Sequence, residues 1–270
     1  MNKATLQTAL KHLPLGGLRY LEQVGSTNDI ALAWAEEKNV RDYSLVVANE
    51  QIAGRGRNGR KWQTPPDSAL AFSLLLHPNK VEASQLTLFT ALGALALTTA
   101  LQENYALKTE IKWPNDVLIE GKKVAGILVE ANWVGDTPTS IVLGMGINIR
   151  QEAVPPADEL LFPATCLDTA LGKPAVREEL LSELLNTLID WRPRLGTDEM
   201  VSAWDKHLAF KGQQVQAQER DGQVIHGTLL GINKDGSLRL DTVESIHFGD
   251  VHLRPSGLGY RRILSKEEVN

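Results

Sequence analysis

Cysteine is nearly absent from the sequence, which contains only Cys166 among its 270 residues. One cysteine cannot form an internal disulfide, so nothing in the chain requires an oxidising compartment. Long apolar runs are missing as well. No stretch approaches the roughly 18 uncharged apolar residues of a membrane span, and the chain up to Leu15 lacks the apolar core of a signal peptide. These absences predict a soluble, cytoplasmic protein.

Positive charge is also in short supply, with 28 Lys and Arg residues against 33 Asp and Glu residues. A general nucleic-acid binder needs many cations to meet phosphates, so the net charge of -5 argues against that class. The six histidines show no metal-ligand spacing, and no Ser/His/Asp nucleophile arrangement is legible. The Walker A and Rossmann glycine patterns are absent too. The functional site must therefore be sought in other patterns.

The composition, 43% hydrophobic and 23% charged, is that of a globular protein, and the length fits two domains. Helical and strand patterns alternate over most of the chain. Ser84 is expected to cap one helix, and Gly121-Lys122-Lys123 is expected to form a hairpin turn. We expect strands at residues 43–48, 69–76, 110–113, 116–120, 124–133 and 139–149, and helices at residues 29–37, 84–102, 176–188 and 198–208.

The pattern changes after residue 211. Short alternating segments at residues 214–218, 224–230, 238–240 and 246–253 are separated by Asp221-Gly222 and Asp235-Gly236. Asp-Gly between apolar runs is a strong hairpin signal. We therefore predict two domains, a larger one of helices and strands at residues 1–211 and a small β-barrel at residues 212–270.

The most informative stretch is residues 54–62, Gly-Arg-Gly-Arg-Asn-Gly-Arg-Lys-Trp. Three glycines and four cations fall within its first eight residues, with no acid among them. Glycine lets backbone N–H groups approach an anion, and arginine pairs with phosphate bidentately. Taken alone, the stretch is also compatible with a solvated basic loop or an Arg-Gly segment that contacts RNA.

Two further segments combine turn residues with functional side chains. The first is Lys112-Trp113-Pro114-Asn115-Asp116, in which Pro114 sets a turn and the next two residues can point polar atoms away from the strands. The second is residues 144–148, Gly-Met-Gly-Ile-Asn, where glycines inside a strand suggest close approach of a ligand or backbone. Taken alone, the first is an ordinary turn and the second a β-bulge. Trp62 and Trp113 are as well explained by core packing as by a ligand wall.

Taken in order, these segments closely resemble the biotin protein ligases, which attach biotin to carrier proteins. The resemblance begins at Ser26-Thr27-Asn28, continues through Gln51 and residues 54–62, and covers residues 112–116, 123–130 and 144–148. It implies an α+β fold of the class II aminoacyl-tRNA synthetase and biotin ligase type, with a mixed sheet and flanking helices. The C-terminal segment would then be a Src-homology-like β-barrel. That segment matches the family in length and texture more than in motif.

The resemblance also implies a two-step reaction. Biotin and ATP, with Mg²⁺, give biotinyl-5'-AMP and pyrophosphate, and a lysine of the carrier then attacks the mixed anhydride and releases AMP. The implied partner is the biotin carrier domain of acetyl-CoA carboxylase or a similar carboxylase. Only 25 residues precede Ser26, too few for the winged-helix DNA-binding domain of some bacterial members, so we expect the form without it. We expect a monomer or weak homodimer, and no DNA or membrane partner.

Site residues follow from the resemblance position by position. Lys123 is placed beside the biotin carboxylate and the α-phosphate, as a catalytic residue together with Arg57. Asn115, Asp116 and Asn148 are expected near the nucleotide and Mg²⁺. The side chains of Ser26-Thr27-Asn28 are expected to contact biotin, but they are equally well explained as a helix cap. The expected biotin-binding residues are Ser26, Thr27, Asn28, Gln51, Gly54, Arg55, Gly56, Arg57, Lys123, Gly126, Gly144 and Gly146. The expected nucleotide-binding residues are Arg57, Arg60, Trp62, Asn115, Asp116 and Asn148.

Two alternative functions stay open at this point. A lipoate ligase or octanoyl transferase shares the logic of the catalytic lysine, but it accommodates a linear acyl chain and lacks the glycine-arginine loop. A nonenzymatic nucleic-acid-binding protein would instead use Arg55, Arg57, Arg60 and Lys61, and its binding would depend steeply on salt.

A reactive adenylate must be kept from water, and a glycine-rich loop that orders over the ligand would do so. We therefore predict that residues 54–62 are mobile in the free protein and become ordered with biotin. Amide hydrogen exchange of this segment should slow on saturation with biotin. Exchange that is unchanged by saturating biotin would contradict a gating role.

Overall fold

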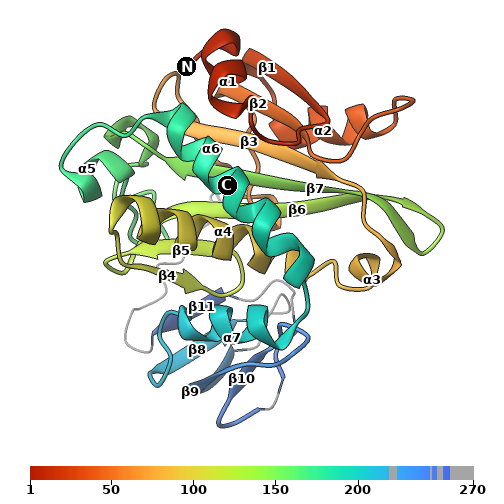
Figure 1. Cartoon of the computed structure of the whole chain (residues 1–270). Helices are drawn as coiled ribbons and strands as arrows, with labels where there is room; N and C mark the ends of the chain where they lie inside the picture. Colours follow the sequence, from red (N-terminus) through yellow and green to blue (C-terminus); the bar gives the residue numbers. More distant parts are fainter. Residues whose placement is uncertain (219–223, 244, 248–251, 256–270) are drawn as a thin grey trace, which may run out of the picture.

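A seven-stranded mixed sheet forms the centre of the molecule (Figure 1). The computed structural model describes residues 1–218, 224–243, 245–247 and 252–255. The strand order is β1-β2-β3-β7-β6-β5-β4, in which β1 and β2 are parallel and every other neighbouring pair is antiparallel. The strands are β1 (Gly17–Val24), β2 (Ser44–Gln51), β3 (Ala69–Leu76), β4 (Thr109–Lys112), β5 (Asp116–Ile119), β6 (Lys122–Val134) and β7 (Thr137–Asn148).

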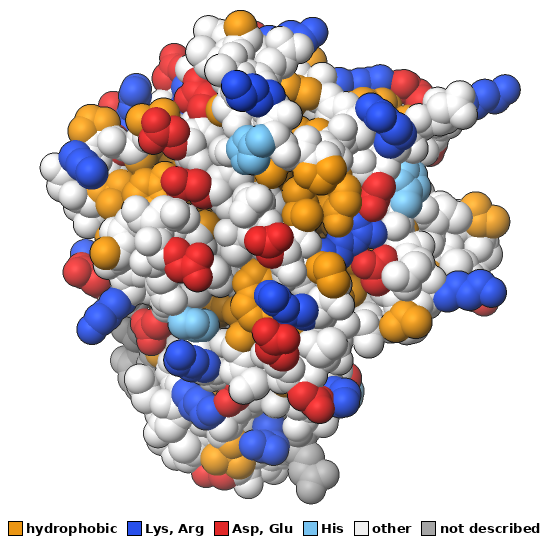
Figure 2. Space-filling view, in the orientation of Figure 1, with side chains coloured by type: hydrophobic (Ala, Val, Ile, Leu, Met, Phe, Trp, Pro, Cys, Tyr) orange, Lys and Arg blue, Asp and Glu red, His pale blue; other side chains and the backbone are white. Residues whose placement is uncertain are grey.

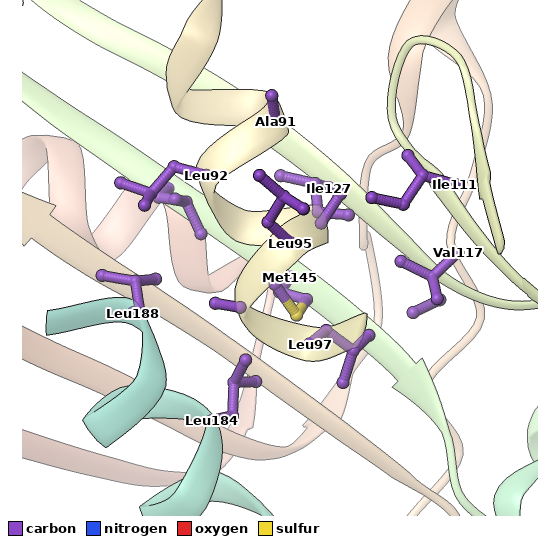
Figure 3. Close-up of a cluster of buried hydrophobic side chains, with 14 of the residues drawn as sticks. Ala91, Leu92, Leu95, Leu97, Ile111, Val117, Ile127, Met145, Leu184 and Leu188 are labelled. Carbon is purple, nitrogen blue, oxygen red and sulfur yellow. The ribbon is translucent and has the colours of Figure 1, made fainter. Parts of the chain in front are cut away.

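Helices cover both faces of this sheet. The helices α4 (Leu88–Tyr105) and α6 (Arg177–Trp191) pack on one face, and α2 (Thr27–Ala35) packs on the other against β2, β3 and β7. The helix α4 is apolar on nearly all sides because it lies between the sheet and α6, where Leu184 and Leu188 face it (Figure 3). Gly93 lets α4 approach closely, since a Cβ there would lie 3.3 Å from Leu143.

The central strands have two different faces. Side chains alternate along a strand, so Leu143, Met145 and Ile147 of β7 enter the core beneath α4, while Gly144 and Gly146 face α2. On β3, Leu70, Phe72, Leu74 and Leu76 belong to the same core, and Ser73 points the other way and hydrogen-bonds to residues of α2. The face toward α2 is therefore lined by small residues.

A second sheet follows the main domain. Its strands are β8 (Gln214–Gln218), β9 (Val224–Ile232), β10 (Leu238–Leu240) and β11 (His252–Pro255), antiparallel in the order β10-β9-β8-β11. It is joined to the first domain by α7 (Asp198–Lys206) and by a hydrogen bond that the Ile232 N–H donates to Asp205 Oδ1 at 3.1 Å. The sheet confirms the predicted all-β segment. The division at residues 211 and 212 stays a prediction.

Most predicted strands and helices are present, with shifted ends, and two differences are informative. Ser84 does not begin the long helix: it ends the short helix α3 (Lys80–Ala83), which Asn79 caps, and α4 begins at Leu88. The hairpin turn is made by Glu120 and Gly121, both with positive φ, so Lys122 and Lys123 already belong to β6. Asp221-Gly222 lies outside the described residues.

Several short elements were not predicted: α1 (Lys3–Leu10), α5 (Leu167–Leu171), and three 3-10 turns, η1 (Arg57–Gly59), η2 (Gln151–Ala153) and η3 (Arg192–Arg194). Strand β1 was missed as well, because its sequence alternates weakly and none of its residues is fully buried.

On the face seen in Figure 2, acidic and basic side chains are interspersed among small apolar areas. None of the helices in the described part of the chain is both long and apolar enough to cross a membrane.

Candidate active site

The segments singled out in the sequence meet at two adjoining cavities. The first has a volume of about 120 Å³ and lies on the glycine-rich face of β6 and β7. The second, of about 390 Å³, shares Arg60, Lys61, Trp62, Lys112, Asp116 and Lys123 with it. Every predicted site residue except Gly54 lines at least one of them, with Asn148 at the second. The first cavity is lined by Ser26, Thr27, Asn28, Gln51, Arg55, Gly56, Arg57, Arg60, Lys61, Trp62, Lys112, Pro114, Asn115, Asp116, Lys123, Gly126, Ile127, Leu128, Gly144, Met145 and Gly146.

The glycine-arginine loop, residues 54–62, is a compact hairpin. The Trp62 N–H donates to the Gly54 carbonyl at 2.8 Å, and the Gly56 N–H donates to the Arg60 carbonyl at 2.7 Å. At the tip, Asn58 and Gly59 have φ of 59° and 71°. A Cβ on Gly54 would overlap the Trp62 carbonyl, so glycine is needed there to close the hairpin.

The arginines of this loop have different partners. Arg55 Nη2 lies 2.6 Å from Asp29 Oδ1 and 2.8 Å from Glu130 Oε2, so its charge is directed at carboxylates of α2 and β6. Arg57 Nη1 donates to Asn115 Oδ1 at 3.3 Å, which ties the loop to the segment after β4. Arg60 is exposed and lines both cavities. The loop therefore brings all three arginines to the cavities, and Arg55 also holds the loop in place.

A buried carboxylate joins two lysines where the cavities meet. Asp116 Oδ1 lies 2.6 Å from Lys123 Nζ, and Asp116 Oδ2 lies 3.5 Å from Lys112 Nζ. Burial alone would raise the pKa of Asp116, but the ammonium groups of Lys123 and Lys112 outweigh it and hold that pKa below its usual range. Asp116 therefore stays ionised and fixes two cations side by side. Lys112 was quoted in the sequence motif but not assigned a role.

Hydrogen bonds to backbone groups fix Asn115 and Trp113, which belong to the same segment as Lys112 and Asp116. Asn115 Nδ2 donates to the Ile127 carbonyl at 3.0 Å, and the Ile127 N–H donates to the Asn115 carbonyl at 2.9 Å. Trp113 is fully buried, and its Nε1 donates to the Gly236 carbonyl at 3.0 Å. Of the two readings of the tryptophans, core packing holds for Trp113, whereas Trp62 lines both cavities.

The opposite end of the first cavity carries uncharged polar groups. Ser26 occupies the N-cap position of α2, but its side chain makes no capping bond to a described residue, and Thr27 and Asn28 lie in the first turn. Thr27 and its backbone N–H donate to Gln51 Oε1 at 3.1 and 2.8 Å, and Gln51 Nε2 donates to Thr64 at 3.2 Å. Ser73 Oγ lies 2.8 Å from Thr27 Oγ1 and 2.5 Å from Asn28 Oδ1. The helix-capping interpretation of these side chains is therefore wrong for Ser26.

The strand glycines make room for two side chains of the site. A Cβ on Gly144 would overlap Asn28 Oδ1, and a Cβ on Gly146 would overlap the Trp62 indole. A Cβ on Gly126 would lie 3.2 Å from Lys123 Nζ and from the same indole. The pairing of β7 with β6 runs without interruption through Gly144 and Gly146, so the β-bulge reading is wrong. Trp62 Nε1 is buried without a hydrogen-bond partner among the described residues.

The second cavity was not predicted. Its apolar wall comes from residues 153–164, a segment that looks like a loop in sequence, and Phe162 lies beneath Lys112 Nζ at 4.9 Å from the ring centroid. Asn148 is buried there and donates from Nδ2 to the Thr165 carbonyl at 3.1 Å. The sequence signal that could have revealed this wall is the apolar run Leu160-Leu161-Phe162, which follows Pro155 and Pro156. An apolar wall beside two lysines suits a flat base whose phosphates face the cations.

The carboxylates in the described part of the chain do not form a dedicated metal site. Across the described ranges there is no group of three His, Cys, Asp or Glu side chains able to hold an ion. Both oxygens of Asp116 face lysines. Magnesium bound mainly by substrate phosphates needs few protein ligands, so these residues fit an ion that arrives with a nucleotide.

Comparisons with known proteins agree with this geometry. Residues 20–148 match the Biotin/lipoate A/B protein ligase family, and residues 210–254 match the Biotin protein ligase C terminal domain. The chain is 31% identical to the bifunctional ligase/repressor BirA of Bacillus subtilis, over 94% of this chain and 79% of that protein. It is 34% identical to the biotin–[acetyl-CoA-carboxylase] ligase of Paracoccus denitrificans, over 82% of this chain and 92% of that protein.

Solved structures show the same relationship. The biotin protein ligase from Aquifex aeolicus in complex with biotin and ATP superposes with a TM-score of 0.76 at 29% identity, over 89% of this chain and 99% of that chain. The biotin protein ligase from Leishmania major in complex with biotinyl-5-AMP superposes with a TM-score of 0.61 at 25% identity, over 86% and 98% of the two chains.

The glycine-rich face of β6 and β7 forms the floor of the first cavity, and its Gly146 can be tested directly. In Gly146→Ala the new methyl group displaces the Trp62 indole from between the cavities. We expect the affinity for biotin, the ligand that the resemblance implies, to fall about tenfold or more, as overpacking costs about 1–3 kcal/mol. Calorimetric titration measures it. Gly25→Ala is the matched control, because a Cβ at Gly25 meets nothing within 4 Å. Equal affinities of the two variants would contradict the role of this glycine.

Proposed function

Because this chain belongs to the biotin protein ligase family, we propose that it activates biotin with ATP and transfers it to a lysine of a carrier protein. The observation that carries the proposal is the polarity of the first cavity. Uncharged hydrogen-bonding groups stand at one end, around Thr27 and Gln51, and cations stand at the other, around Lys123. Biotin has the same division, with a neutral ureido ring and an acid tail.

The ring end suits a neutral bicyclic ligand. An amide-like group buried without partners costs about 1–3 kcal/mol, so the ureido ring needs hydrogen bonds from Ser26, Thr27, Asn28 and Gln51. The apolar body would lie over Gly126, Gly144 and Gly146, where the missing side chains leave space. Gly56 and the backbone of Arg55 would close the pocket from the loop side.

The cationic end suits adenylate formation. A carboxylate oxygen of biotin attacks the α-phosphorus of ATP, and the bond to pyrophosphate breaks. Both reactants are anions, so fixed positive charge at the forming bond lowers the barrier. Lys123 and Arg57 supply that charge, with Lys112 and Arg60 toward the phosphates and Mg²⁺ arriving with ATP as part of the substrate. The base of the nucleotide would lie in the second cavity, near Trp62, Phe162 and Asn148, and Asn115 would face the nucleotide from the first cavity.

The second step transfers biotin to protein. A neutral lysine amine of the carrier attacks the carbonyl carbon of the anhydride, an amide forms, and AMP leaves. The relatives named for acetyl-CoA carboxylase support a carboxyl carrier domain as the partner. The need for ATP fits a cytoplasmic location, and we propose a monomer or weak homodimer. We keep the domain division at residues 1–211 and 212–270 as part of the proposal.

A lipoate substrate is the main alternative within the same fold. The match of residues 210–254 to a biotin ligase domain and the glycine-arginine loop both favour biotin. Competition between biotin and lipoate for the protein separates the two.

The decisive experiment incubates the protein with biotin, Mg-ATP and a carrier domain, and follows the carrier by mass spectrometry. We expect one lysine of the carrier to gain a biotinyl group. Lys123→Met should abolish pyrophosphate release, because it removes the cation between the two reacting anions, and it should leave the fold intact. Lys122→Met is the matched control, since Lys122 is its exposed neighbour on β6. Near-normal pyrophosphate release by Lys123→Met would remove Lys123 from its role.

A further inference from the structure

One carboxylate oxygen connects the glycine-arginine loop to the ring end of the first cavity. Glu130 Oε2, on β6, accepts a hydrogen bond from Asn28 Nδ2 at 2.7 Å and lies 2.8 Å from Arg55 Nη2. Asn28 belongs to α2 and Arg55 to the loop, so two segments far apart in the sequence share this acceptor. Neither the sequence motifs nor the resemblance assigned Glu130 a role.

The contact fixes how Asn28 presents its amide. Asn28 is only 4% exposed, and its Oδ1 lies 2.5 Å from Ser73 Oγ. Its Nδ2 donates to Glu130 and, at 3.3 Å, to the Leu128 carbonyl. An amide has similar shapes in its two flipped orientations, so its partners decide which one is adopted. The Glu130 carboxylate oxygen accepts from Asn28, and it holds the NH₂ group of Asn28 toward β6.

The same carboxylate helps to hold the loop down. Arg55 has two anionic partners, Asp29 and Glu130, whose side chains are 59% and 25% exposed. An exposed ion pair contributes little, whereas a shielded one contributes more. The pair with Glu130 is therefore the stronger restraint on the loop.

We propose that Glu130 is a positioning residue that couples closure of residues 54–62 to the orientation of Asn28 in the biotin pocket. The proposal rests on the proposed function. A free glutamate side chain loses rotamer entropy when it is ordered. Once Arg55 has fixed Glu130, its bond to Asn28 carries no further ordering cost, and the converse holds equally. Biotin that binds beside Asn28 then favours the closed loop, because Asn28 and Arg55 share Glu130 Oε2.

Three variants separate the two contacts. Glu130→Met removes the acceptor from both Asn28 and Arg55. Glu130→Gln keeps a neutral acceptor for Asn28 and loses the ion pair. Asp29→Asn is the matched control, because it removes the other ion pair of Arg55 and leaves Asn28 untouched.

Limited trypsin digestion between Arg55 and Lys61 reports loop opening without any catalysis. In the ligand-free protein we expect cleavage to be about fivefold faster in Glu130→Met and Glu130→Gln, and about twofold faster in Asp29→Asn. Saturating biotin should slow cleavage of the wild type and of Asp29→Asn. That protection should be lost in Glu130→Met, which is the signature of coupling.

Kinetics provide an independent readout. The KM for biotin should rise about tenfold in Glu130→Met, as expected for a lost hydrogen bond to a charged group, and kcat at saturating biotin should stay within about twofold. Glu130→Gln should restore the KM but still release more AMP than the wild type in the absence of carrier, because the adenylate is less protected from water.

Biotin protection in Glu130→Met as strong as in Asp29→Asn would overturn the coupling. If Glu130→Met does not fold, Glu130→Gln decides, and ligand-free cleavage no faster than that of Asp29→Asn would overturn the restraint on the loop. Failure of the proposed function has a different signature: the wild type itself would show neither biotin protection nor pyrophosphate release.

Discussion

The site depends on missing side chains on one face of the central sheet. Where β6 and β7 face α4, they carry Ile127, Leu143 and Met145, which form the core. Where they face α2, they carry Gly126, Gly144 and Gly146. Because successive side chains point to opposite faces, the same strands build a dense core and a bare floor. The loop and α2 can approach this floor only because it has no Cβ atoms at these positions.

Charge in the site is arranged by acids that lie beside the cations rather than by an excess of base. The chain is acidic overall, yet Lys112 and Lys123 stand side by side because Asp116 lies between them. Two ammonium groups this close would repel each other without that carboxylate. Arg55 is neutralised in the same way by Asp29 and Glu130. Cations already held in position do not have to reorganise when anionic reactants arrive, which is the condition for electrostatic stabilisation of a transition state.

Local pattern predicted what depends on local pattern. The alternation of residues 69–76 and the turn residues around Gly121 located strands to within a few residues. The sequence motifs, taken in order along the chain, identified most of the residues that line the first cavity. The predicted helix start at Ser84 was wrong because Asn79 caps a separate short helix, α3, which ends at Ser84, and the long helix α4 begins only at Leu88. The partners of Asn28, Ser73 and Glu130, lie 45 and 102 residues away, a pairing that only the folded sheet creates. The apolar wall of residues 153–164 escaped notice for the same reason.

The C-terminal sheet bears on the site through a residue that does not touch either cavity. Trp113 lies between Lys112 and Asn115, which line the first cavity, but its own side chain points away and is fully buried. Its indole N–H donates to the Gly236 carbonyl in the turn between β9 and β10. The segment is thus held from two sides, by the pairing of β4 with β5 and by the second sheet. Loss of either restraint would let Lys112 and Asp116 move together, and with them the charge that Asp116 shares with Lys123.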